Sequence, residues 1–190
     1  MNTALLVIDF INDIVNPLGK IPSCAAQVIE KNTIKQANKA IHFARSQHWL
    51  VLPIKVGFSV NYAEMPKNSP IFSKAQQFQA LALNQWGTEF DTELAIASTD
   101  CVIIKHRVSP FHGTQLDLVL KTQAIERLVV CGVSSAWAIQ AAAREGHDRD
   151  YSIVILENAC AAASEQEHGI AMEQLARIAT IIHTDALATL

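Results

Sequence analysis

The order of the apolar segments constrains the fold of this chain more than any other feature of its sequence. Six short runs rich in Val, Ile and Leu recur along the 190 residues, at 4–8, 49–54, 101–104, 128–131, 152–156 and 179–182. Each run is continuously apolar rather than alternating, which is typical of strands that are buried on both faces. The runs therefore predict a six-stranded, mostly parallel sheet that is covered on both sides.

Helical patterns fill the intervals between these runs. Residues 32–47 carry an apolar stripe at spacings of three and four. Ser164, with Glu167 three residues later, has the spacing of a capping box at the start of a helix. Strands that alternate with helices predict βαβ units. We expect an α/β fold with helices on both faces of the sheet, formed by one domain over residues 1–190. Further helices are predicted at 114–122, 134–144 and 164–176.

The composition excludes several classes of partner. The formal net charge of −3 lacks the basic excess of a nucleic-acid-binding protein. No stretch approaches the roughly 20 apolar residues of a membrane span, and the first apolar run is too short for a signal peptide. We therefore expect a soluble, cytoplasmic protein with no nucleic-acid or membrane partner.

The cysteines show no metal-binding or redox spacing. No Cys-x-x-Cys motif is present, so neither a zinc site nor a disulfide is predicted. Two of the four cysteines, Cys101 and Cys131, lie at the edges of apolar runs, where cysteine is most often a small buried hydrophobe. We expect all four to be reduced thiols: Cys24, Cys101, Cys131 and Cys160.

Three residues that could carry chemistry lie where predicted strands end. Asp9 follows the first run, Lys105 the third and Gly132 the fourth. Taken alone, these residues fit a loop carboxylate, a solvent-exposed lysine and an ordinary turn. Ligands of open parallel sheets bind beyond the carboxyl ends of the strands, so one crevice should receive all three. They predict a charged pair for proton transfer beside a turn, at Val133 and Ser134, whose N–H groups bind an anion or oxyanion.

The segment from 57 to 86 differs from the rest of the chain. It contains Pro66 and Pro70, many polar residues and no clear period. A loop of this length inside a compact domain is usually functional. We expect it to cover the crevice as a lid and to set the substrate specificity.

Four segments of the chain resemble the isochorismatase-like hydrolases, also called the cysteine hydrolase superfamily. They occur in the order that this family shows, from residue 4 to about residue 160. The segments are 5–13 (LLVIDFIND), 86–94 (WGTEFDTEL), 105–116 (KHRVSPFHGTQL) and 132–144, which opens on a Gly-Val turn.

The resemblance implies a Rossmann-like, three-layer α/β/α sandwich around a mostly parallel six-stranded sheet. It also implies a site made of an aspartate, a lysine and a cysteine. The aspartate corresponds to Asp9 and the lysine to Lys105. The cysteine position lies six residues after Gly132, where this chain has Ala138. The resemblance also implies a small-molecule substrate and a homodimer or homotetramer. We expect four aromatic residues to line the substrate pocket: Phe58, Trp86, Phe111 and Trp137.

Ala138 leaves three interpretations open, because alanine has no atom that can attack a carbonyl. In the first, which the resemblance to isochorismatases implies, the chain hydrolyses a vinyl ether without cysteine, and Asp9 donates the proton beside Lys105. In the second, Ala138 is an engineered replacement of the nucleophile of an amidase or related C–N hydrolase, with an oxyanion hole near Ser134. In the third, the protein is a non-catalytic binding member of the family.

No histidine lies where a metal site or an activated serine nucleophile would need one. Metal-dependent relatives group aspartate and histidines after the second strand, but residues 55–61 contain no histidine. We therefore expect no metal and no other cofactor. No histidine is evidently placed to activate Ser134 or Ser135 as a nucleophile.

Overall fold

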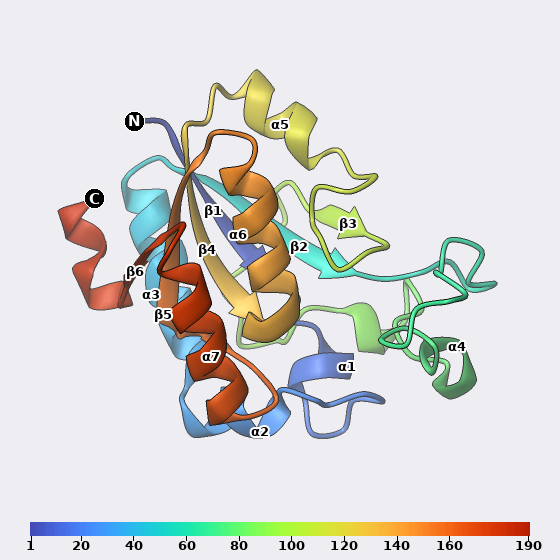
Figure 1. Ribbon diagram of the computed structural model, residues 1–190. Coiled ribbons are helices and arrows are strands. Elements are labelled where there is room, and N and C mark those ends of the chain that lie inside the picture. The colour runs from blue at the N-terminus through green and yellow to red at the C-terminus, as the bar shows by residue number, and fades with distance from the viewer.

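The structure, a computed structural model, describes residues 1–190 and has a six-stranded sheet at its centre (Figure 1). The strands lie in the spatial order β3-β2-β1-β4-β5-β6, and every neighbouring pair is parallel. The prediction of a parallel sheet buried on both faces is confirmed. The strands are β1 (Thr3–Ile8), β2 (Leu50–Val56), β3 (Ile103–Lys105), β4 (Arg127–Val133), β5 (Ser152–Ala161) and β6 (Thr180–Ile182).

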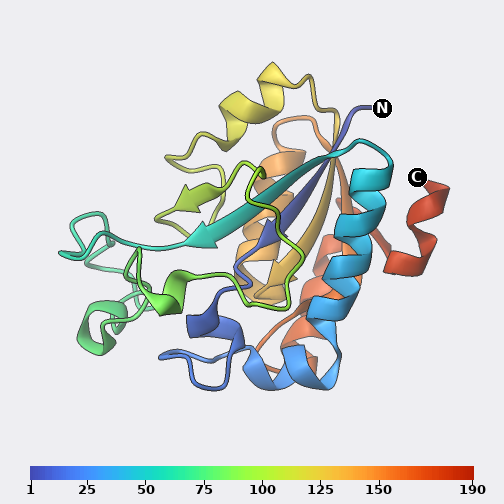
Figure 2. The same cartoon turned by 180° about the vertical axis from the view of Figure 1, so that it is seen from behind.

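Helices cover both faces of the sheet. α6 (Gln140–His147) and α7 (Glu165–Leu175) lie in front of it in Figure 1, and α3 (Thr33–Ser46) lies on the opposite face, in front in Figure 2. This arrangement confirms the three-layer α/β/α sandwich. No helix is both long enough and apolar enough to cross a membrane. The remaining helical elements are α1 (Asn12–Val15), α2 (Ala25–Glu30), α4 (Ala75–Phe78), α5 (Leu116–Thr122), η1 (Trp86–Thr88), η2 (Ser135–Ile139) and η3 (Thr184–Thr189).

Local sequence signals explain how two of these helices form. The hydroxyl of Ser164 accepts the N–H of Glu167 at 3.2 Å, so the predicted cap at the start of α7 is confirmed. The predicted stripe of α3 faces the core, because spacings of three and four place its residues on one side of the helix. Its four members are all buried: Ile34, Ala37, Ile41 and Ala44.

The burial expected for Cys101 is wrong. This residue is exposed, because β3 begins only at Ile103 and leaves the start of the apolar run outside the sheet. Cys131 lies within β4 and is fully buried, as expected. All four cysteines are free thiols.

The chain reverses its direction of travel across the sheet between β1 and β4. From β1 it adds β2 and β3 on one side, and it then crosses back to add β4, β5 and β6 on the other. Such a reversal leaves a crevice at the carboxyl ends of the two central strands, where ligands of open α/β sheets bind. Asp9 directly follows β1 and Ser134 directly follows β4, so the topology places both residues at this crevice.

Gly132 allows β4 to approach β1 closely at the edge of the crevice. Its backbone has φ +131°, and a Cβ at this position would lie 2.1 Å from the carbonyl oxygen of Ile8. Ile8 is the residue before Asp9 and pairs with Gly132 across the two strands. A side chain here would therefore push apart the two strands that carry the site.

The 57–86 segment is a folded lid rather than a structureless loop. Its two ends pair with each other, since Phe58 donates its N–H to Leu81 and accepts the N–H of Leu83, both at 2.8 Å. The ring of Phe58 packs edge-to-face against Phe72 at 5.4 Å, inside a small apolar cluster separate from the main core. In Figure 1 the segment, with α4, extends beyond the ends of β1 and β2.

Replacing Gly132 with alanine should destabilise the fold by at least about 2 kcal/mol, because the new Cβ would be strained by its φ and would collide with backbone. The matched control is Gly169→Ala in α7, where an added Cβ meets nothing within 4 Å. That change should stabilise the protein by about 0.5–1 kcal/mol. Urea denaturation measures both effects, and wild-type stability of Gly132→Ala would contradict the role of this glycine.

Candidate active site

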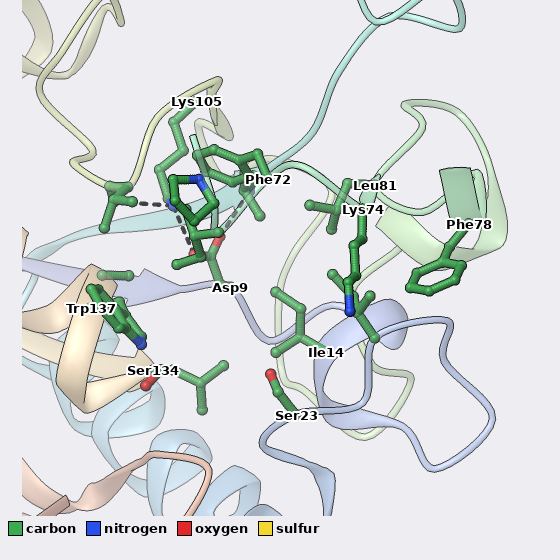
Figure 3. A pocket seen from close by; sticks show the side chains of 17 residues that line it. Asp9, Ile14, Ser23, Phe72, Lys74, Phe78, Leu81, Lys105, Ser134 and Trp137 are labelled. Carbon is green, nitrogen blue, oxygen red and sulfur yellow. Dashed lines mark hydrogen bonds and ion pairs between the residues drawn. The ribbon is translucent and has the colours of Figure 1, made fainter. Parts of the chain in front are cut away.

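A buried ion pair between Asp9 and Lys105 forms the polar centre of the crevice (Figure 3). The Nζ of Lys105 lies 2.8 Å from Oδ2 of Asp9, and the two side chains are only 2% and 4% exposed. Lys105 also donates to the carbonyl oxygens of Arg107 and Val108, each at 3.2 Å. Its ammonium thus has a partner for each of its three N–H bonds.

The backbone holds the Asp9 carboxylate in place. Asp9 has a left-handed φ of 58°, which aspartate tolerates better than most residues. Its N–H donates to the carbonyl of Ile54 at 2.8 Å, and its Oδ1 accepts the N–H of Val56 at 2.7 Å. Two strands besides β1 therefore fix the position of this carboxylate: β2 through these hydrogen bonds and β3 through Lys105.

Burial makes Asp9 easier to protonate than an ordinary aspartate. Loss of water raises the pKa of its carboxyl above the usual 3.8, while the Lys105 ammonium and the N–H of Val56 act in the opposite direction. An acid at this position can donate a proton at a higher pH than an exposed aspartate can. The environment therefore suits proton transfer.

A cavity of about 330 Å³ opens beside the ion pair, within the range of small-molecule sites. The lid contributes one wall, and the residues after β1, β3 and β4 contribute the others. Most of the lining side chains are apolar. The cavity brings together six of the residues predicted from the sequence: Asp9, Lys105, Val133, Ser134, Trp137 and Ala138.

The turn after β4 presents Ser134 and Ala138 to this cavity. The hydroxyl of Ser134 accepts the N–H of Ala136 at 3.2 Å, and its carbonyl accepts the N–H of Ile139 at 3.1 Å in a turn of π-helix. The N–H of Ser134 has no acceptor within the chain. Ala138 is 4% exposed and contributes only a methyl group to the wall.

A family model of the isochorismatase domain matches residues 3–186 of this chain. The chain belongs to the isochorismatase family. It is 32% identical over 169 residues to the isochorismatase family protein YecD of Escherichia coli O157:H7, covering 87% of this chain and 83% of that one. It is 30% identical over 178 residues to the ureidoacrylate amidohydrolase RutB of Acinetobacter baylyi, covering 87% of this chain and 73% of that one.

Solved structures share the fold as well. The crystal structure of an isochorismatase family protein from Desulfovibrio vulgaris superposes with a TM-score of 0.86 and 23% identity. The match covers 99% of this chain and 97% of that one. The family match over residues 3–186 spans the sheet, both helical layers and the lid.

Two of the segments that resemble the isochorismatase family pack against each other. Asn12 donates its side-chain N–H to the carbonyl of Trp86 at 2.9 Å. The buried carboxylate of Asp13 accepts the N–H of Leu81 at 2.7 Å, and a Cβ on Gly87 would lie 2.3 Å from one of its oxygens. The pairing of these segments ties the lid to α1, next to the site.

Three of the four aromatic residues predicted to line the pocket do not line the cavity. Phe58 is fully buried in the lid cluster, and Phe72 faces the cavity instead. Trp86 is 46% exposed, and its backbone carbonyl accepts the hydrogen bond from Asn12. Phe111 packs away from the cavity, stacked on Tyr151 at 6.4 Å. These aromatic residues lie near the motifs in the sequence, but that nearness does not indicate the direction in which their side chains point.

The structure also shows a buried serine–histidine contact that the sequence did not reveal. The hydroxyl of Ser135 and Nδ1 of His168 share a hydrogen bond of 2.8 Å, although the two residues are 33 positions apart. Burial lowers the pKa of His168 below 6.5, which favours its neutral form. Neither residue lines the cavity, so the contact holds the turn after β4 against α7.

Cys24 is a second residue near the site that sequence reasoning passed over. It immediately precedes α2 and follows Ser23, which lines the cavity. Burial raises the pKa of its thiol to about 11, although the hydroxyls of Ser23 and Ser134 act in the opposite direction. At neutral pH it is a thiol rather than a thiolate and is a weak nucleophile.

The donor groups of the chain form no obvious metal centre. No cluster of three or more His, Cys, Asp or Glu side chains has the proximity needed to hold a metal ion. Asp9, the one acidic side chain that lines the cavity, is already paired with Lys105.

Replacing Lys105 with methionine should destabilise the protein by about 3–5 kcal/mol at neutral pH, because it leaves the buried Asp9 charge unpaired. Without Lys105, the folded-state pKa of Asp9 rises further above its unfolded value. Below pH 4, Asp9 of the variant is protonated and carries no unpaired charge. As the pH rises through the folded-state pKa, the buried carboxyl must ionise without a partner, and the folded state loses this stability. The difference in free energy of unfolding between wild type and variant should therefore grow with pH.

Urea denaturation at pH 5 and pH 7.5 tests this expectation. Lys121→Met is the matched control, because Lys121 pairs with Asp117 on the surface and its loss should have little effect at either pH. The double variant Asp9→Asn/Lys105→Met should recover part of the lost stability. An equal deficit at both pH values would contradict the coupling between the two groups.

Proposed function

We propose that this protein hydrolyses a small organic substrate in the cavity beside Asp9 and Lys105, without a cysteine nucleophile. We also propose that Ala138 occupies the position at which cysteine hydrolases of the family carry their nucleophile. The observation that carries the proposal is the shared cavity, which joins a buried acid–base pair to the methyl group of Ala138.

The thiols of the chain support chemistry without cysteine. Burial raises the pKa of Cys24 to about 11 and that of Cys160 to about 12, and it raises the pKa of Cys131 well above 9.0. None of these side chains lines the cavity. The reaction then depends on proton transfer by Asp9 and on attack by water.

Hydrolysis of a vinyl ether suits these groups. Protonated Asp9 donates its proton to the terminal carbon of the C=C–O unit, and the adjacent carbon becomes an oxocarbenium ion. Water adds to that carbon, and its proton returns to the Asp9 carboxylate. The resulting hemiketal splits into a ketone and an alcohol, so the net reaction consumes one water. Lys105 stabilises the carboxylate that forms when Asp9 gives up its proton.

Asp9→Asn should lower kcat for a vinyl ether by at least about 100-fold, because the amide cannot donate the proton. Pyruvate release from isochorismate measures the reaction. The wild-type rate should fall as the pH rises through the elevated pKa of Asp9, since only the protonated acid is active. Asp148→Asn, at an exposed surface position, is the control and should keep full activity. Undiminished turnover by Asp9→Asn would exclude this mechanism.

A second candidate function is hydrolysis of a C–N bond, and the similarity to the amidohydrolase RutB favours it. In this case the chain carries the site of an amidase with alanine at the nucleophile position. The unpaired N–H of Ser134 would then belong to the oxyanion hole.

Ala138→Cys separates the two candidates. On a panel of small amides, the wild-type chain should release no ammonia, and Ala138→Cys should release it if the site is that of an amidase. Ala136→Cys is the control, because Ala136 lies two residues away and does not line the cavity. If the wild type releases no pyruvate from isochorismate and Ala138→Cys releases no ammonia from the amides, both enzymatic candidates are contradicted. This outcome would favour the non-catalytic binding interpretation.

A further inference from the structure

The charges of the cavity do not balance. Three charged side chains line it: Asp9, Lys74 and Lys105. Asp9 and Lys105 neutralise each other at 2.8 Å. Lys74 remains, so the cavity carries one positive charge that no group of the protein offsets.

The lid contains two lysines without a side-chain partner, Lys67 and Lys74, and only Lys74 lines the cavity. Lys20 donates to the carbonyl of Gln79 at 2.7 Å, and Lys55 donates to the carbonyl of Thr88 at 3.0 Å. Lys74 forms neither a hydrogen bond nor an ion pair with its side chain. The lysines that form ion pairs are Lys31, Lys39, Lys105 and Lys121.

The position of Lys74 separates it from the acid–base pair. It immediately precedes α4 in the lid, whereas Asp9 and Lys105 lie at strand ends. In Figure 3 its ammonium ends on the side of the cavity where Ile14 and Ser23 lie, apart from Asp9. A group bound by Lys74 would therefore belong to a different part of the ligand from the reacting bond.

The cavity also has an apolar rim that remains open to water. Ile71, Phe78 and Trp137 line the cavity but are 48%, 44% and 56% exposed. Large apolar side chains gathered around one cavity mark a surface that a ligand covers. The ligand that suits this rim has an apolar body.

We propose that Lys74 is a specificity-determining residue that binds a carboxylate of the substrate. The proposal rests on the hydrolytic function proposed above and names its substrate class: an apolar organic acid whose carboxylate lies away from the bond that is cleaved. The ammonium of Lys74 pairs with the carboxylate, the rim packs on the apolar body, and the reacting bond lies beside Asp9 and Ala138.

Binding of two matched probes tests this assignment without turnover. 4-Phenylbutyrate and its primary amide share size and shape and differ in charge, and titration calorimetry gives both dissociation constants. Wild type should bind the carboxylate about tenfold more tightly than the amide, and added salt should reduce this preference because Lys74 is exposed. Lys74→Met should bind both probes equally.

Two further variants test whether the preference depends on the charge and on the position of Lys74. Lys74→Arg retains the charge and should retain the preference. Lys67→Met removes another exposed lysine of the lid that does not line the cavity, and it should leave the preference unchanged. The proposal is overturned if wild type shows no preference, if Lys74→Met keeps it, or if neither probe binds. Because no turnover is measured, these outcomes are independent of whether Asp9 or a restored cysteine performs the reaction.

Discussion

The buried ion pair of Asp9 and Lys105 is the interaction on which the site depends. Either charge alone in this position would cost several kcal/mol, so each requires the other to be in place. Asp9 follows β1 and Lys105 ends β3, and β2 lies between these strands. Val56 at the end of β2 completes the arrangement by donating its N–H to Asp9. Three neighbouring strands must therefore form in register before the carboxylate is held.

The other half of the site depends on a close contact of backbone. Gly132 lets β4 lie against Ile8, directly before Asp9, and the turn that follows carries Ser134 and Ala138 into the same cavity. The contact of Ser135 with His168 holds this turn from behind. The groups at the strand ends are thus held in place by hydrogen bonds and close contacts within the sheet.

The lid is built differently and suits a different task. It has its own apolar cluster around Phe58, and it is tied to α1 through the carboxylate of Asp13. Its cavity face carries Lys74 and two of the three exposed apolar side chains of the rim, Ile71 and Phe78. The cluster also includes Ile11 and Val56, so it packs the lid against the ends of β1 and β2. Under the proposed function, the sheet ends perform the chemistry and the lid selects the substrate.

The sequence by itself determined the sheet, its parallel order of strands and helices, and the places of Asp9, Lys105 and Gly132. Continuous apolar runs indicate strands that are buried on both faces. The residue at which a run stops marks the carboxyl end of a strand, where side chains can reach a ligand. Prediction was weaker where no period exists. Nothing local distinguishes Phe58, which points into the lid, from Phe72, which faces the cavity.

The tertiary structure alone decided which side chains meet. Ser135 and His168 are 33 residues apart, and the backbone of Trp86, rather than its ring, contacts Asn12. The partnerless state of Lys74 likewise emerges only when every neighbouring acid and carbonyl has been placed. Local patterns encode whether a residue is buried, but its direction and its partners depend on how distant segments pack together.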